Sequence, residues 1–109
     1  MHKVNLLEEA SKVSELWGRV TPLKFNDYDV HVNRIKGEYV WHSHADTDDV
    51  FLVLSGRMIM QLRSGDVELE PGDMFVVPAG VEHCPKADEE TVIVCIEPRD
   101  TAPAGDPEI

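Results

Sequence analysis

The sequence predicts an all-β fold, an antiparallel sandwich or barrel preceded by one short helix. From Pro22 onward, short runs rich in Val, Ile, Phe and Tyr follow one another, and Gly, Pro, Asp and Asn residues separate them. No alternation of helices and strands supports a parallel sheet. With 109 residues, of which 42% are hydrophobic, the chain is expected to fold as a single globular domain over about residues 1–100.

The N-terminal segment predicts the helix, over about residues 5–17. Asn5 is a good N-cap, because its side chain can accept a hydrogen bond from a backbone N–H of the first turn. Gly18 marks the expected end of the helix. Apolar residues recur between these limits at spacings of three and four, which is the period of an amphipathic helix: Leu6, Leu7, Ala10, Val13, Leu16 and Trp17.

The barrel is expected over about residues 22–97, in seven short strands. These strands are predicted at residues 29–35, 39–42, 50–54, 57–62, 67–69, 74–77 and 91–97. Tight turns are predicted at residues 36–37, 55–56, 64–65 and 71–72, and the acidic run at residues 88–90 is interpreted as a solvated turn. Residues 101–109 carry two prolines that cannot continue a strand, so an extended or disordered tail is expected there.

The charge balance excludes several classes of partner. Acidic residues outnumber basic ones by 21 to 10, which gives a net charge of −11, whereas nucleic acids and anionic membranes bind surfaces rich in Lys and Arg. The N-terminus has no apolar export segment, and two cysteines do not make a disulfide scaffold. We therefore expect a cytoplasmic protein with reduced thiols, binding neither nucleic acid nor membrane.

The pair His42-Ser43-His44 carries the first chemical signal. Residues two apart on an extended chain point to the same face, so both imidazoles can converge on one ion. Asp49 and His83 are the other candidates. Three imidazoles and a carboxylate suit a transition metal, whereas calcium and magnesium prefer shells of oxygen atoms alone.

Two motifs in this region resemble those of the cupin family. The stretch Gly37-Glu38-Tyr39-Val40-Trp41-His42-Ser43-His44, followed by Asp49 and Gly56, is similar to the first cupin motif. The stretch Gly72-Asp73-Met74-Phe75-Val76-Val77-Pro78-Ala79-Gly80-Val81-Glu82-His83 is similar to the second, with every spacing kept. The 15 residues between them match the short linker of compact bacterial, RmlC-like members. Gly56 and Gly72 stand where turns require a positive φ.

The resemblance implies a jelly-roll barrel in which His42, His44, Asp49 and His83 bind one divalent transition metal, such as Fe, Mn, Ni or Zn. Asp49 replaces the usual glutamate and is one methylene shorter, so the sequence leaves open whether it reaches the ion. Gly37 stands one residue closer to His42 than is usual in the family. Ala87 replaces the asparagine that often ends the second motif.

The resemblance indicates the residues of the site but not the reaction or its substrate. The leading hypothesis is a metal-dependent enzyme acting on a small molecule by oxygenase- or isomerase-like chemistry. The alternatives are a non-catalytic module that binds a small molecule or a sugar, a barrel that has lost its metal, and an epimerase-like barrel without metal. Glu82 and Tyr39 are the nearest candidates for a general base. Small cupins are commonly dimers, so a homodimer is expected.

The alternation of side chains along a strand predicts which way the residues near the candidate ligands point. Phe51 and Val53 should share the facing of Asp49 and could line a pocket, whereas Tyr39 and Trp41 should point away from His42. Cys84 should face away from His83, and Cys95 is expected to be a buried, inert thiol. His2 and His31 are interpreted as structural or solvated residues.

Overall fold

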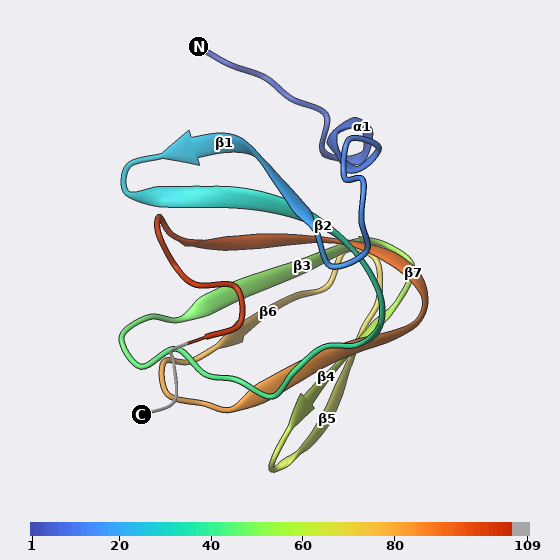
Figure 1. Cartoon of the computed structure of the whole chain (residues 1–109), viewed down its shortest axis with the longest axis vertical. Coiled ribbons are helices and arrows are strands. Elements are labelled where there is room, and N and C mark those ends of the chain that lie inside the picture. The colour runs from blue at the N-terminus through green and yellow to red at the C-terminus, as the bar shows by residue number, and fades with distance from the viewer. Residues whose placement is uncertain (106–109) are drawn as a thin grey trace.

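The computed structural model describes residues 1–105 and confirms the all-β class (Figure 1). One helix, α1 (Leu6–Ala10), precedes the strands. The strands are β1 (Arg19–Phe25), β2 (Tyr28–Glu38), β3 (Asp49–Ser55), β4 (Met58–Leu62), β5 (Gly65–Leu69), β6 (Met74–Val77) and β7 (His83–Pro98). Every pairing between these strands is antiparallel.

The long strand β7 joins the two layers of the fold. The main sheet has the strand order β1-β2-β7-β3-β6. Residues 92–96 of β7 pair with β3, whereas residues 83–86 pair with β4, which also pairs with β5. Figure 1 shows β7 and its partner β2 running from the upper layer to the lower one. The inner faces of the two layers oppose each other across this bend and enclose the core and the candidate site.

The core follows from the alternation of side chains along the strands. Residues 49–53 of β3 alternate between buried and partly exposed, so Asp49, Phe51 and Val53 share the inner face, as the sequence predicts. Met58 and Met60 of β4 are completely buried against them. The only charged residue in this inner row of β3 is Asp49. The position of this carboxylate is therefore set by the same alternation that builds the core.

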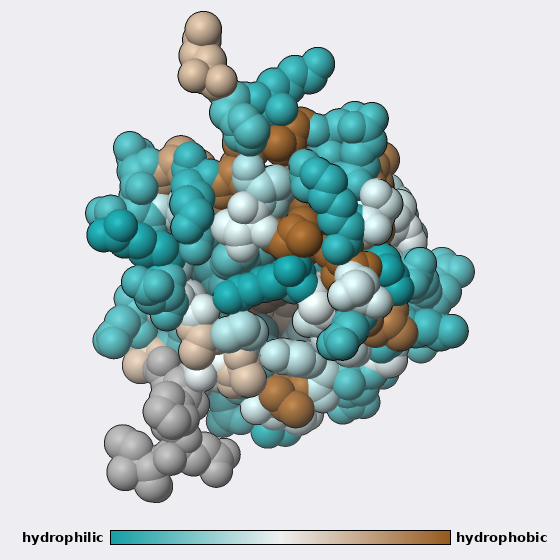
Figure 2. Space-filling model, turned by 45° about the horizontal axis from the view of Figure 1, so that its top comes forward, coloured by the Kyte–Doolittle hydropathy of each residue, from teal (hydrophilic) through white to brown (hydrophobic). Residues whose placement is uncertain are grey.

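The opposite face of the main sheet carries a second apolar cluster, which includes Val30, Val32 and Val94. Ala10 and Leu6 of α1 pack against it, so the helix covers part of the sheet. The face seen in Figure 2 is mostly hydrophilic, with hydrophobic residues in small separate patches. Within residues 1–105, no helix is long and apolar enough to span a membrane.

The predicted helix is wrong in its length. Asn5 caps α1 as expected and accepts a hydrogen bond from the backbone N–H of Glu8 at 3.0 Å, but the helix ends at Ala10 and does not continue to residue 17. Trp17 has a φ of 66°, which is incompatible with a right-handed helix. Its backbone N–H donates instead to the carbonyl oxygen of Arg34 in β2. Contact with the sheet thus overrides the apolar periodicity after Ala10.

Four features of the predicted strands and turns need correction. The strand β1 was not predicted, and residues 39–42 form no continuous strand, because only His42 makes an isolated bridge. Strand β7 begins at His83, so the acidic run at residues 88–90 lies within a strand rather than in a turn. Gly37, with a φ of 85°, marks a shift of register inside β2 rather than a turn between strands.

Candidate metal centre

His42 and His83 are paired directly across an isolated antiparallel bridge. The backbone N–H of His42 donates to the carbonyl oxygen of His83 at 3.0 Å, and the reciprocal bond measures 2.9 Å. Directly opposed residues project their side chains to the same face of a sheet. The two imidazole rings accordingly lie with their centroids 4.2 Å apart. The bridge thus brings together two residues that are 41 positions apart in the sequence.

Both rings are held in the same way by local backbone carbonyl groups. Nδ1 of His42 lies 2.8 Å from the carbonyl oxygen of Val40, and Nδ1 of His83 lies 2.9 Å from that of Val81. A carbonyl oxygen only accepts, so each Nδ1 carries the proton and each Nε2 keeps a free lone pair. Metal-binding histidines are commonly oriented by such a bond from the second ring nitrogen.

His44 and Asp49 complete the cluster. The imidazole nitrogens of His42, His44 and His83 that could bind an ion all lie within 4.8 Å of one another. Nε2 of His44 lies 2.9 Å from Oδ2 of Asp49, and Nε2 of His83 lies 4.0 Å from the same oxygen atom. The structure therefore brings together all four predicted residues, and the shorter aspartate side chain does reach the histidines.

Two buried atoms of this cluster have no hydrogen-bond partner within the described residues: Nε2 of His83 and Oδ1 of Asp49. His83 is 1% exposed and Asp49 is 3% exposed. Buried polar atoms without a partner are costly, and each needs an explanation. An imidazole nitrogen and a carboxylate oxygen together form the donor set of a borderline transition metal. The residues present therefore fit a divalent ion of this kind.

Sequence reasoning missed a second carboxylate, that of Glu97. Glu97 is buried at the end of β7, and one of its carboxylate oxygens lies within 4.8 Å of the candidate ligand atoms of His44 and Asp49. Its Oε1 atom lies 3.1 Å from Nη1 of Arg19 and 3.2 Å from Nε2 of His31. Glu97 is therefore held from the side opposite the histidine cluster.

A signal for Glu97 is present in the sequence, although it lies outside both motifs. Along β7, residues two apart share a face, which places Glu97 in the same row as the inward-facing Ile93. A glutamate that ends such an apolar run is a candidate for a buried functional carboxylate. His31, left without a role by the sequence, is 3% exposed and bridges Glu97 to the hydroxyl group of Thr21, 2.8 Å from its Nδ1.

The electrostatics of the site follow from this crowding of buried groups. Burial, followed by the neighbouring Glu97 carboxylate, raises the pKa of Asp49 to about 8. Burial opposes ionisation of Glu97 too, but its contacts with His31, Asp49 and Arg19 outweigh it and lower the pKa of Glu97. Burial lowers the pKa of His83 to about 4, so this imidazole is neutral at physiological pH and can bind a metal.

The loop before β7 aims His83 into the site. Gly80 has a φ of 80°, and its N–H donates to the carbonyl oxygen of His44 at 2.8 Å, which ties the loop to the first histidine pair. The Asp48 carboxylate accepts a hydrogen bond from the N–H of Ala79 at 2.8 Å. Asp48 thus fixes the loop, while its neighbour Asp49 faces the histidines.

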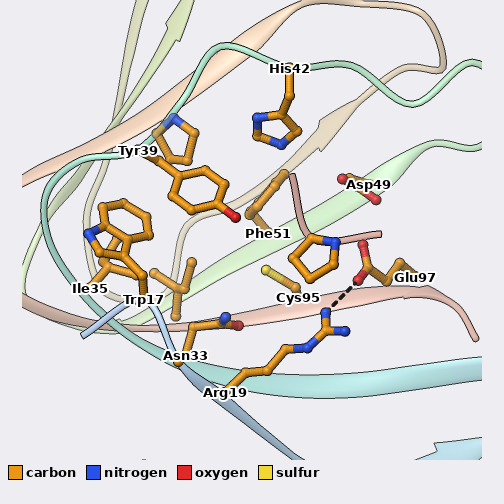
Figure 3. Close-up of a pocket in the computed structure, with 14 residues that line it drawn as sticks. Trp17, Arg19, Asn33, Ile35, Tyr39, His42, Asp49, Phe51, Cys95 and Glu97 are labelled. Atoms are coloured by element: carbon orange, nitrogen blue, oxygen red, sulfur yellow. Dashed lines mark hydrogen bonds and ion pairs between the residues drawn. The ribbon is translucent and has the colours of Figure 1, made fainter. Parts of the chain in front are cut away.

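A cavity opens beside the cluster and contains His42, Asp49 and Glu97 in its wall (Figure 3). Tyr39 also lines it, and its ring centroid lies 5.5 Å from that of His42. The expectation that Tyr39 points away from His42 is therefore wrong. β2 ends at Glu38, and the strand alternation on which that expectation depended does not continue to His42.

Of the other residues named from the sequence, some line the cavity and others lie away from it. Phe51 lines the cavity, as expected. Glu82 is exposed and forms an ion pair with Arg63 at 3.0 Å, so it does not line the cavity with Tyr39. Cys84 is completely buried and contacts Glu38, away from the cavity. Cys95 lines the cavity, and burial raises the pKa of its thiol well above the usual value.

The segment after β7 returns to the site. Pro103 lines the cavity, and Gly105 is buried against the backbone of Ser43 and the side chain of His42. A side chain at Gly105 would lie within 2.5 Å of the Ser43 carbonyl oxygen. Residues 101–105 thus close one side of the cavity, while residues 106–109 of the expected tail lie outside the described part of the chain.

Comparison with known proteins identifies the family of the chain. The family model of the cupin domain Cupin_2 matches residues 29–97, which is more than half of the chain. The chain belongs to the cupin family. Its relative YdbB of Bacillus subtilis, an uncharacterised protein, is 32% identical over 94 residues, which cover 85% of this chain and 83% of YdbB.

Two solved structures resemble this chain to different degrees. A cupin-2 domain protein from Shewanella frigidimarina has a TM-score of 0.86 and 41% identity, over 88% of this cupin chain and 94% of that one. The hydroquinone 1,2-dioxygenase PnpCD, solved in complex with Cd²⁺ and 4-hydroxybenzonitrile, has a TM-score of 0.75 and 20% identity. The match covers 95% of this chain and 76% of that one. The second likeness concerns the fold alone.

Proposed function

We propose that this cupin is a metal-dependent enzyme that acts on a small molecule, with one divalent transition metal held by His42, His44, His83 and Asp49. The observation that carries the proposal is the buried Nε2 atom of His83, which has no hydrogen-bond partner in the described residues while Nδ1 is occupied by a carbonyl group. Such an arrangement costs free energy unless a ligand uses the lone pair.

When bound, the metal would supply Lewis-acid or redox chemistry at the edge of the cavity. The residues of the chain supply the cavity lining and the neighbouring carboxyl groups. Phe51 and Tyr39 give the cavity an aromatic lining. In the site without metal, the raised pKa of Asp49 and the lowered pKa of Glu97 place the shared proton on Asp49, which would release it on binding the ion.

Turnover distinguishes the enzyme from a binding module. We expect protein reconstituted with Fe, Mn, Ni or Zn to convert a member of a panel of diketones, phenols and enols, measured as oxygen uptake or as product formation. The chelated protein and His83→Ala should be inactive on the same compound. If the reconstituted protein binds such compounds but converts none of them, as measured by thermal shift, the non-catalytic module replaces the enzyme.

We further propose a homodimer in the cytoplasm. The edge strand β6 exposes Met74 and Val76, with exposed fractions of 58% and 48%, beside the partly buried Leu52 of β3. An edge strand with exposed apolar side chains favours pairing with a second chain. Both cysteines are free thiols, which supports a reducing compartment.

A further inference from the structure

The buried His31 links the edge strand β1 to the carboxyl groups beside the proposed metal centre. Its side chain is 3% exposed, and it pairs directly with Cys95, which lines the cavity. Its Nδ1 atom lies 2.8 Å from the Thr21 hydroxyl oxygen in β1, and its Nε2 atom lies 3.2 Å from Oε1 of Glu97 in β7. Both ring nitrogens of this histidine therefore face polar side chains of the two neighbouring strands.

An irregularity in β1 directs Thr21 at His31. The register of β1 against β2 shifts between Val20 and Leu23, so Thr21 and Pro22 together oppose the single residue His31. Two residues against one is the arrangement of a β-bulge, which redirects a side chain. Pro22 has no N–H group and cannot donate a bond to the neighbouring strand. The bulge thus brings the Thr21 hydroxyl group to the imidazole ring.

Glu97 lies between His31 and the proposed metal ligands. Figure 3 shows Glu97 between Arg19 and Asp49, with Nη1 of Arg19 3.1 Å from its Oε1 atom. A carboxylate oxygen of Glu97 lies within 4.8 Å of the candidate ligand atoms of Asp49 and His44. The adjacent strands β1, β2, β7 and β3 each contribute one side chain to this row, in the order Thr21, His31, Glu97 and Asp49.

The fold does not require a charged row at this place. Replacing a buried ion pair by apolar residues of similar volume is commonly neutral or stabilising, because removing charges from water is costly. Neighbouring positions of the same inner face are apolar, including Ile35 of β2 and Ile93 of β7. Partners that bond to the groups around a metal orient these groups, and their loss lowers metal affinity. The row gives the Glu97 carboxyl group such a fixed direction.

We propose that His31 is a positioning residue of the metal centre and acts through Glu97. Thr21 holds the Nδ1 atom of His31, so Nε2 is directed at Oε1 of Glu97 and keeps this carboxyl group beside Asp49. Arg19 places a positive charge against the same oxygen atom. The inference rests on the proposed function, because Asp49 is a proposed ligand. The position of Glu97 is a property of the chain itself and is tested without metal.

Crystal structures of the protein grown with chelator test this position. His31→Leu has a similar volume but neither nitrogen atom, so we expect the Glu97 carboxyl group to turn away from Asp49. In His31→Gln, whose amide group can still donate to Oε1, Glu97 should keep its place. A Glu97 carboxyl group that does not move in His31→Leu would overturn the proposal. This result is readable even if the wild type binds no metal, which would contradict the proposed function alone.

Metal affinity tests the action through Glu97. We expect His31→Leu to lower the affinity for Mn²⁺ about fivefold, the effect of one net hydrogen bond. It should also change the absorption spectrum of the Co²⁺-loaded protein, whereas His31→Gln should retain both properties. In the Glu97→Gln background, His31→Leu should have no further effect, because residues of one network are not additive. A fivefold loss in both backgrounds, or His31→Gln binding as weakly as His31→Leu, would overturn the proposal.

The exposed Thr21 provides a milder variant, which keeps the test decisive if His31→Leu does not fold. Thr21→Val removes the hydroxyl group at a similar volume, and Thr21→Ser keeps it. We expect Thr21→Val to displace the His31 ring and the Glu97 carboxyl group in the metal-free crystal structure, and Thr21→Ser to leave both in place. A Thr21→Val structure in which His31 and Glu97 keep their wild-type positions would overturn the proposal.

Discussion

Nε2 of His44 lies 2.9 Å from Oδ2 of Asp49, and both side chains are 5% exposed. This contact bears on the question that the sequence leaves open, because an aspartate takes the place of the family's usual glutamate. The shorter carboxylate reaches the histidine cluster, so a site of three histidines and one carboxylate is geometrically available.

Replacing Asp49 by Asn keeps the shape of the side chain but removes the carboxyl group that would ionise on binding a metal. We expect the affinity for Mn²⁺ or Zn²⁺ to fall by at least about tenfold, since even partners outside the ligand shell contribute that much. Asp48→Asn is the matched control, because Asp48 bonds to the Ala79 N–H instead of facing the histidines. Isothermal titration of the metal-free proteins measures both affinities. An equal affinity for wild type and Asp49→Asn would show that three histidines alone bind the ion.

Glu97→Gln tests the carboxylate that the motifs do not contain. Its loss leaves Arg19 and His31 without their shared partner and removes the charge beside Asp49, so we expect metal affinity to fall about tenfold. The absorption spectrum of the Co²⁺-loaded protein should also change, which a purely structural role would not cause. Glu90→Gln, on the exposed part of the same strand, is the control. An unchanged spectrum and affinity would remove Glu97 from the site.

Gly56 should be the most sensitive glycine of the two motifs. It has a φ of 83°, and a Cβ atom there would lie 2.4 Å from the Thr91 hydroxyl oxygen and 2.9 Å from the Glu90 carbonyl oxygen. Strain and overpacking together predict a loss of about 3 kcal/mol in the free energy of unfolding for Gly56→Ala. Gly72→Ala, with a φ of 93° but no atom within 4 Å, should lose about 1 kcal/mol. Urea unfolding measures the difference, and equal losses would refute the steric argument.

The proposed dimer predicts an effect of charge on β6. Met74→Lys together with Val76→Lys places two cations on the exposed edge, which should prevent pairing without affecting the core. Light scattering after gel filtration should give twice the chain mass for the wild type and the mass of one chain for the double variant. A wild-type protein that elutes as a monomer at all concentrations would contradict the dimer.

The sequence was sufficient for the fold class and for the residues that gather at the site. Alternation placed Asp49, Phe51 and Val53 on one face of β3, and the two motifs placed His42, His44 and His83 near one another. These predictions succeeded because the period of a strand and the conformations allowed to glycine are local properties. They need no knowledge of how distant segments pack.

The sequence was insufficient where distant contacts override a local pattern. The apolar period continues to Trp17, but the Trp17 N–H bonds to Arg34 and the chain turns into β1 instead. Tyr39 enters the cavity because β2 ends one residue before it. Glu97 joins Asp49 only through the pairing of β3 with β7, between segments more than 40 residues apart. Such tertiary contacts have no signature within a short window of sequence.

The metal content of the purified protein shows whether the histidine cluster is a metal centre. We predict close to one transition-metal ion per chain, measured by elemental mass spectrometry on protein purified without chelator. His83→Ala should lose this ion, whereas His2→Ala, at the exposed N-terminus, should keep it. Metal at 100 times its dissociation constant should also add about 2.7 kcal/mol to the stability of the chelated wild type. A wild-type protein without metal, whose thermal stability is unchanged by Fe, Mn, Ni or Zn, would contradict metal binding by these histidines.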